Sequence, residues 1–181
     1  MSILKFTLIL LFLSPITDVF ANFSVRTAEA YLSDDVYYLD ADLDYTLSEE
    51  AIKALHSGVK LTLRVTIDIE KDSWWDRRVA RLKQRYTLQY LALSEQYTLK
   101  YLNLQGLEEM FPSLESALEA LGQLRKFPLI DKALVKPDKV YWVRLRNYLD
   151  IEALPTALRL VAYFSGEWRL SADWFKCSLQ Q

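Results

Sequence analysis

Apolar and polar residues alternate without a break from Val59 to Glu70, with apolar side chains at odd positions and polar or charged ones at even positions. A period of two is typical of a β-strand that buries one face and exposes the other. Sheets with one solvated face are usually antiparallel. The segment therefore predicts the central strand of a half-solvated antiparallel sheet.

Looser alternation predicts two hairpins around this strand. The first joins Phe23–Leu32 to Val36–Tyr45 through the turn signal Ser33-Asp34-Asp35. The second covers residues 80–104, with a turn at 94–96, although its first part, Val79–Arg85, fits a helix as well as a strand. Two later segments alternate in the same way and predict single strands: Lys139–Tyr148 and Trp168–Trp174.

Three segments carry helix signals. Ser48 is a suitable N-cap before two glutamates, and Gly58 suits the left-handed residue that ends a helix. Ser113 is a second N-cap, and a third short helix is predicted from Pro155 to Tyr163. An apolar stripe at helical spacing follows Ser113: Leu114, Ala117, Leu118 and Leu121. Residues 123–128 are expected to form a connection.

The predicted fold class is α+β. Short turns between successive strands favour a mostly antiparallel curled sheet or sandwich, with about seven strands and two or three helices. The 181 residues are 51% hydrophobic, which is enough for a packed core and excludes a disordered chain. The net charge of −2 argues against a nucleic-acid partner, and the four glycines argue against a glycine-rich phosphate loop.

The first 21 residues have the pattern of a secretory signal peptide. Lys5 supplies a positive charge, Phe6–Leu13 forms a short apolar core, and Val19-Phe20-Ala21 provides a cleavage site. An uncleaved membrane anchor is the less favoured alternative, because the apolar run is far shorter than the roughly 20 residues that span a bilayer. We therefore expect cleavage after Ala21, a periplasmic location without stable membrane insertion, and a single globular domain over residues 22–181.

Cys177 is the only cysteine. An exported chain with one thiol has no internal disulfide, so its stability must come from packing. We expect a buried, inert thiol, and a reactive or intermolecular thiol is the alternative.

Acidic and imidazole side chains offer weak candidate sites. The alternation of Asp40, Asp42 and Asp44 resembles the start of a calcium loop, but Tyr45 stands where the loop needs glycine. We therefore expect a solvated edge face and no metal site. His56 is the only histidine, which excludes a zinc site of several histidines and leaves one imidazole for any catalytic triad.

A basic cluster directly follows two adjacent tryptophans, Trp74 and Trp75. One interpretation is an aromatic-anchored surface that binds an acidic partner, a lipid headgroup or a polysaccharide. The other is a solvated strand or helix face with the tryptophans in the core. The candidate partner-binding residues are Trp74, Trp75, Arg77, Arg78, Arg81 and Arg85, with Lys83 in the same cluster.

Several short motifs follow one another along the chain: Ser57–Glu70, Trp75-Asp76, Arg85-Tyr86, Leu93-Ser94 with Tyr97, Phe111–Leu114 before Ala117-Leu118, and Trp168–Ser171 with Trp174. Taken in this order, they resemble a family of uncharacterised exported proteobacterial proteins with a domain of unknown function. Members of this family tend to be encoded beside a membrane sensor histidine kinase, so the resemblance implies a periplasmic role close to signalling and brings no catalytic residues.

Three functional hypotheses follow. The favoured one is a periplasmic accessory protein without enzymatic activity or cofactor, which binds the extracytoplasmic part of a membrane-bound sensor protein. The second is a small hydrophobic-ligand carrier, since 11 tyrosines and 5 tryptophans could line a cavity in a curled sheet. The third, a hydrolase, ranks last because no set of acidic residues and His56 converges in the sequence.

Overall fold

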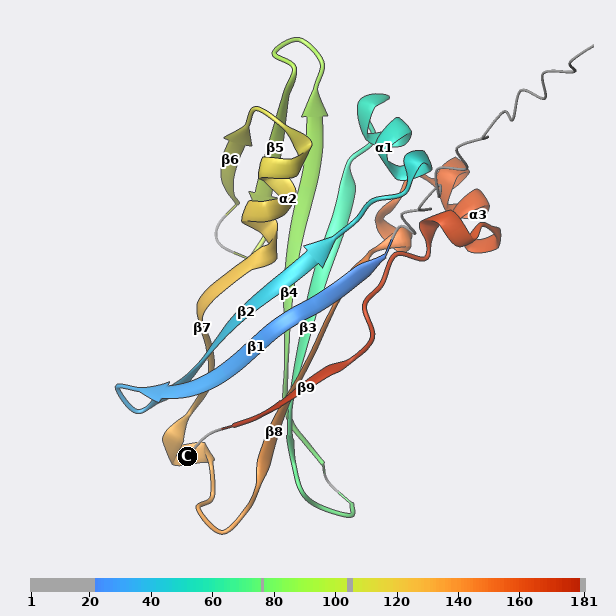
Figure 1. The fold of residues 1–181 in the computed structure, drawn as a ribbon. Helices are drawn as coiled ribbons and strands as arrows, with labels where there is room; N and C mark the ends of the chain where they lie inside the picture. Colours follow the sequence, from blue (N-terminus) through green and yellow to red (C-terminus); the bar gives the residue numbers. More distant parts are fainter. Residues whose placement is uncertain (1–21, 76, 104–105, 180–181) are drawn as a thin grey trace, which may run out of the picture.

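The computed structural model describes residues 22–75, 77–103 and 106–179. Two antiparallel sheets pack face to face, and their strands cross at a steep angle (Figure 1). The smaller sheet has the order β1-β2-β7, and the larger one has the order β6-β5-β4-β3-β8-β9. The fold is thus an open α+β sandwich. The strands are β1 (Phe23–Ser33), β2 (Val36–Tyr45), β3 (Leu61–Lys71), β4 (Arg78–Leu91), β5 (Gln96–Tyr101), β6 (Leu107–Phe111), β7 (Gln123–Asp131), β8 (Tyr141–Leu149) and β9 (Phe175–Ser178).

Both predicted hairpins are confirmed. β1 pairs with β2 in antiparallel register, and Asp34 and Asp35 form the turn in the left-handed backbone region. β4 pairs with β5 and with β3, so the ambiguous segment Val79–Arg85 is a strand. The central strand begins at Leu61, two residues later than the alternation predicts, and lies between β4 and β8.

The prediction of a connection at 123–128 is wrong, because these residues begin the edge strand β7. Its pairing with β2 shifts twice, and Pro128 lies next to one of the shifts, where a missing N–H is tolerated. Because of these irregularities, apolar and polar residues do not alternate regularly in this segment, and the sequence pattern does not indicate a strand. The short, largely exposed strand β6 was also absent from the sequence-based prediction.

The strand predicted over Trp168–Trp174 is wrong as well. Its buried and exposed residues do alternate, but only Ser171 forms a bridge, with Tyr148, and Trp168 ends a 3₁₀ turn. The backbone binds β8 by single hydrogen bonds, such as Ala172 N to Asn147 O at 2.8 Å. Regular pairing begins only at β9.

The three predicted helices are present. α1 (Glu49–His56) is capped by Ser48, whose hydroxyl accepts a hydrogen bond from the Ala51 N–H, and Gly58 has a φ of 87°. α2 (Leu114–Gly122) begins with a capping box between Ser113 and Ser116. α3 (Thr156–Phe164) follows Pro155.

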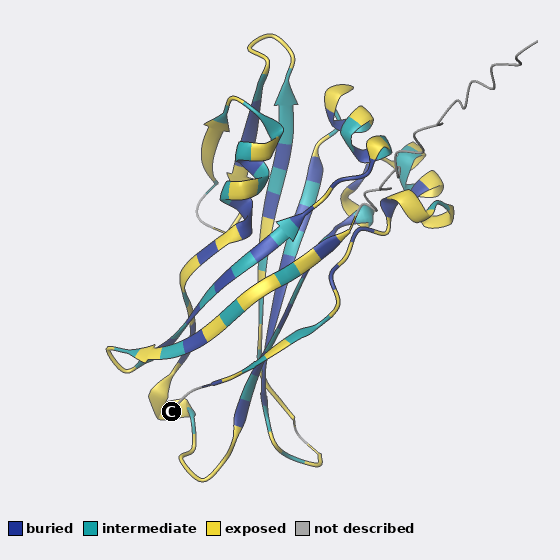
Figure 2. Cartoon of the chain, in the orientation of Figure 1, coloured by how far each residue is buried: buried dark blue, intermediate teal, exposed yellow. Residues whose placement is uncertain are grey.

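The core lies between the two sheets. Buried residues alternate with more exposed ones along the strands (Figure 2), as the period of two requires. β3 supplies five residues with no exposed surface: Leu61, Leu63, Val65, Ile67 and Ile69. Burial of each such side chain contributes about 1.5–3 kcal/mol, so β3 is a major contributor to the core.

Gly122, the last residue of α2, lies directly against β2. A Cβ atom at this position would lie 2.3 Å from the backbone oxygen of Leu43. Backbone atoms of a paired strand cannot move aside easily, so only glycine allows α2 to approach β2 this closely.

We expect Gly122→Ala to lower the free energy of unfolding by about 1–3 kcal/mol, because the added methyl group must displace α2 or β2. Urea denaturation measures the change. Gly166→Ala is the matched control, since a Cβ there meets no atom within 4 Å. Equal stability of the two variants would contradict the proposed close contact.

Candidate functional site

The two adjacent tryptophans lie on the connection between β3 and β4, at one end of the larger sheet (Figure 1). Trp74 is 87% exposed and Trp75 is 90% exposed. Val140, the residue before β8, is also exposed and accepts a hydrogen bond from the N–H of Asp72 in the same connection. An apolar tip of this kind is unusual on a protein surface. We call Trp74, Trp75 and Val140 the tryptophan tip.

Three of the candidate arginines bind carboxylates of β3. Asp68 is only 1% exposed, and Arg81 donates to both of its oxygens at 2.6 Å. Arg78 lies 3.5 Å from the same carboxylate, and Arg77 lies 3.7 Å from Glu70. These arginines therefore compensate buried negative charge, which is a structural role.

The pKa of Asp68 reflects this compensation. Burial opposes ionisation of the carboxyl group, but the hydrogen bonds and charge of Arg81, aided by Arg78 and Arg144, outweigh burial and lower the pKa below its ordinary value. Arg144 also donates to Glu70 at 3.2 Å from the other side of β3. The ion pairs thus connect three strands of the sheet.

Lys83 and Arg85 differ from these arginines. Both are exposed on the outer face of β4, opposite Thr66 and Arg64 of β3. Within residues 22–75, 77–103 and 106–179, neither forms an ion pair with a carboxylate within 4.0 Å. Arg85 lies about 24 Å along β4 from Arg78. The sequence-predicted site is therefore two sites: the tryptophan tip and a basic stretch of the sheet face.

The outer face of the larger sheet is basic across its width. The strand registers place these cations on it: Arg64, Arg81, Lys83, Arg85, Lys100, Arg144, Arg146 and Lys176. Trp174 stacks on the guanidinium groups of Arg144 and Arg146, with 4.8 Å from each to the ring centroid. This aromatic contact holds Arg146 on the face without neutralising it.

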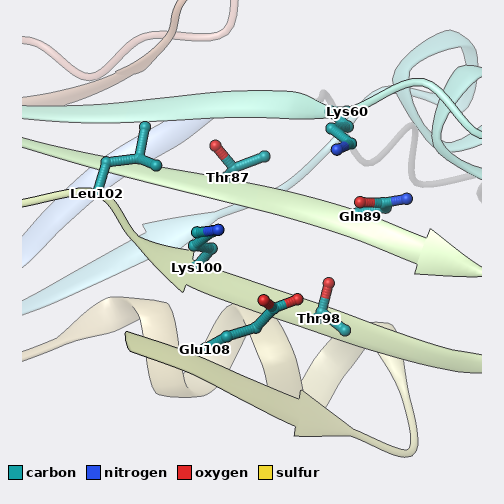
Figure 3. Close-up of a pocket in the computed structure, with 7 residues that line it drawn as sticks. All are labelled: Lys60, Thr87, Gln89, Thr98, Lys100, Leu102 and Glu108. Atoms are coloured by element: carbon teal, nitrogen blue, oxygen red, sulfur yellow. The ribbon is translucent and has the colours of Figure 1, made fainter. Parts of the chain in front are cut away.

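A hollow of about 270 Å³ opens on the same face, over β3, β4, β5 and β6 (Figure 3). Its polar side chains project from the sheet on the side opposite α2. The lining residues are Lys60, Thr87, Gln89, Thr98, Lys100, Leu102 and Glu108. Sequence reasoning missed this set because its members are ordinary outward-facing strand residues, and only the strand order brings them together.

Asp40, Asp42 and Asp44 share the outer face of β2. β2 is the middle strand of its sheet, so the expectation of an edge face is wrong. Asp42 binds Arg125 and accepts from Thr27 at 2.9 Å, and Arg125, ahead of Thr27, lowers its pKa. Among the described residues, no group of three or more His, Cys, Asp or Glu side chains is placed to hold a metal ion.

His56 and Cys177 both pack against neighbouring side chains. The Nε2 of His56 lies 2.7 Å from the hydroxyl of Tyr97, and its ring packs edge-on against Tyr90. Cys177 is half-buried on β9, where burial, followed by the charge of Glu29, raises the pKa of the thiol to about 11. A thiol with that pKa is mostly protonated at neutral pH, and the half-buried side chain is more exposed than the buried thiol that the sequence predicted.

Other surface features do not fit the carrier hypothesis. One hollow of about 760 Å³ has Tyr37 as the one aromatic residue in its lining. A smaller one of about 210 Å³ touches three aromatic residues: Phe23, Trp174 and Phe175. Neither hollow combines a large volume with an aromatic lining. Elsewhere, α3 turns an apolar stripe to solvent, and its Phe164 is 90% exposed.

By its structure, the protein is a two-sheet antiparallel sandwich with an exposed apolar tip and a basic sheet face that contains a hollow. The chain belongs to the family described as Domain of unknown function (DUF4390), whose family model matches residues 21–178. No curated protein and no solved structure gives a significant match. No helix in residues 22–75, 77–103 and 106–179 has the length and apolar character to cross a membrane.

We expect Asp68→Asn to lower the free energy of unfolding at pH 7 by about 1–3 kcal/mol, because Arg78 and Arg81 lose a charged acceptor. Folding lowers the pKa of Asp68. The ionised carboxylate therefore stabilises the protein above the ordinary carboxyl pKa of about 4, and this contribution disappears as the pH falls through the lower folded value.

Urea titrations between pH 7 and pH 2 measure this difference. The gap in stability between the wild type and Asp68→Asn should close as the pH falls below about 4. Asp138→Asn is the control, because Asp138 is exposed and lies 3.9 Å from Lys139 only. A gap that stays constant down to pH 2 would contradict the role of the ionised carboxylate.

Proposed function

We propose that this protein is an exported accessory protein that binds a protein partner through the tryptophan tip, and that it is not an enzyme. The partner is the extracytoplasmic part of a membrane-bound sensor protein. One observation carries the proposal: two adjacent tryptophans are almost fully exposed on the connection between β3 and β4. Tryptophan is the residue type that most often dominates binding energy when a partner buries it.

The surroundings of the tip favour a partner with an acidic surface. Arg77 and Arg78 lie at the base of the tip, and their side chains stay 66% and 52% exposed although they pair with Glu70 and Asp68. Cations around an apolar centre resemble the rim of a protein interface, where charge steers association. The tip also lies on a backbone-bonded connection, since Lys71 N donates to Arg77 O at 2.7 Å.

The proposed export rests on residues 1–21, which lie outside the described residues. Support comes from the pattern of Lys5, Phe6–Leu13 and Ala21 in the sequence. β1 begins at Phe23, two residues after the proposed cleavage site, so cleavage after Ala21 leaves this strand whole. The absence of a catalytic role is supported by His56, whose imidazole interacts with tyrosines at the end of α1.

Mass spectrometry of the protein from periplasmic extracts tests the export proposal. We expect the intact mass of a chain that begins at Asn22, because signal peptidase cuts after the small residue Ala21. Replacing Ala21 with Arg should leave the precursor uncleaved in the membrane fraction. Recovery of the wild-type chain from the cytoplasm with Met1 in place would contradict this part of the proposal.

Crosslinking in intact cells, followed by purification and mass spectrometry, tests the binding proposal. We expect the wild type to recover a membrane sensor protein, and Trp74→Ala with Trp75→Ala to recover at least about tenfold less, because each buried tryptophan contributes about 2 kcal/mol or more. Both side chains are exposed, so the double variant should unfold at the same temperature as the wild type.

Phe164→Ala is the matched control for this experiment. Phe164 is as exposed as Trp75 but lies on α3, toward the opposite end of the larger sheet (Figure 1). Loss of the partner in Phe164→Ala with retention in the tryptophan variant would place the docking surface on α3. Equal recovery by all three proteins would contradict a role for the tryptophan tip.

A further inference from the structure

We propose that the hollow on the outer face of the larger sheet binds an acidic sugar unit of an anionic polysaccharide, with the chain continuing along β4. This site lies about 30 Å along β4 from the tryptophan tip. It goes beyond the proposed function and does not rest on it.

The first observation is an excess of positive charge in the hollow. Lys60 and Lys100 line it and are exposed. Lys100 lies opposite Glu108 in the pairing of β5 with β6, but in the described part of the chain neither lysine forms an ion pair within 4.0 Å. Two lysines against one carboxylate leave the concave surface with a net positive charge, which favours an anionic group there.

The second observation is the mixture of neutral groups between the two lysines. Thr87 and Thr98 present hydroxyl groups, and Gln89 presents an amide, from adjacent strands (Figure 3). Hydroxyls and amides both donate and accept, while the Glu108 carboxylate accepts only. Such a set suits a ligand that carries many hydroxyl groups and one acidic group, as each ring of an acidic polysaccharide does.

The third observation is the line of cations that leaves the hollow. Arg85 and Lys83 follow Thr87 on the outer face of β4, at steps of about 7 Å. Arg146 lies beyond Thr66 in the same row as Lys83. A polymer with one negative charge per ring places its charges at intervals that these long, flexible side chains can match.

Other anions fit the hollow less well. Nucleic acids are usually held by aromatic rings on which bases stack, and no aromatic residue lines this hollow. An acidic peptide would bring carboxylates to Lys60 and Lys100 but few hydroxyl donors for Glu108. The volume of about 270 Å³ is just below the range of roughly 300–1,000 Å³ for drug-sized ligands, so it suits a single ring.

Nuclear magnetic resonance titration of the isotope-labelled purified protein with oligogalacturonate, which has one carboxylate per ring, tests the proposal. We expect saturable shifts of the backbone signals of Thr87, Gln89 and Thr98, and an affinity that falls at high salt. Neutral dextran oligosaccharides should bind much more weakly because they lack the carboxylate. Polyglutamate of equal charge should bind more weakly because it lacks the hydroxyl groups.

Variants locate the site. Lys100→Gln and Arg85→Gln should each lower the affinity about fivefold to tenfold, since each removes one charge–charge contact. Lys53→Gln is the control, because Lys53 is exposed on α1 and pairs with Glu49. The double replacement of Trp74 and Trp75 should leave oligogalacturonate binding unchanged, which separates this proposal from the proposed function.

Three outcomes would overturn the inference. Equal affinity for polyglutamate would show that charge alone is recognised. Binding of phosphatidylglycerol vesicles through Lys100 and Arg85, without binding of oligogalacturonate, would identify a lipid surface as the ligand. Shifts that never saturate, or that remain in Lys100→Gln, would show that the hollow is not the site.

Discussion

The pairing of β3 with both of its neighbours determines most of the structure. In the observed register, the apolar side chains of β3 face the core, while Asp68 lies between Arg81 of β4 and Arg144 of β8. A shift by one residue would move every side chain to the other face. It would bury Asp68 and Glu70 among leucines, at a cost of several kcal/mol for each charge. Hydrophobic burial and ion pairing therefore select the same register.

The second sheet depends on the first through a few specific contacts. Asn147 of β8 has no exposed surface, and its Nδ2 donates to the backbone oxygen of Asp44 in β2 at 2.9 Å. This bond connects the two sheets through a polar group in an apolar interior, where an unpaired amide would cost about 1–3 kcal/mol. The close approach of Gly122 to Leu43 in turn fixes the end of α2 against β2 of the smaller sheet.

The near-neutral net charge conceals two faces of opposite sign. The outer face of the smaller sheet carries Asp40, Asp42 and Asp44, whereas the outer face of the larger sheet is basic. The sequence indicated which strands are charged, but it did not indicate which strands lie beside them in each sheet. Arg125 and Arg26 pair with Asp42 and Asp44, so the acidic face is partly neutralised, and an acidic partner or ligand is attracted mainly to the basic face.

Strand identity was predictable wherever one face is buried and pairing is regular. This holds for Val36–Tyr45 and for the segment that became β3, where alternation reports burial directly. It failed at β7, where bulges and Pro128 interrupt the period, and at 168–174, where alternate burial occurs without ladder pairing. The exposed tip was visible in the sequence as Trp74-Trp75. The hollow was not, because its walls come from four segments whose order only folding reveals.

The two halves of the basic face have different physical origins. Near the tip, the arginines pair with Asp68 and Glu70, so they stabilise the sheet whatever else they bind. Toward the hollow, Arg85 lies directly opposite Arg64, and like charges in such a pair destabilise a sheet by roughly 0.2–1 kcal/mol.

Asp150 pairs with Arg64, whereas neither Arg85 nor Lys83 forms an ion pair within 4.0 Å among the described residues. A net charge of −2 does not require these cations for solubility. Of these side chains, Arg85 opposes folding through its position opposite Arg64, and an anionic ligand on this face would offset that repulsion. The size of the hollow beside them limits the size of the ligand, and the polar groups that line the hollow determine which functional groups the ligand must carry.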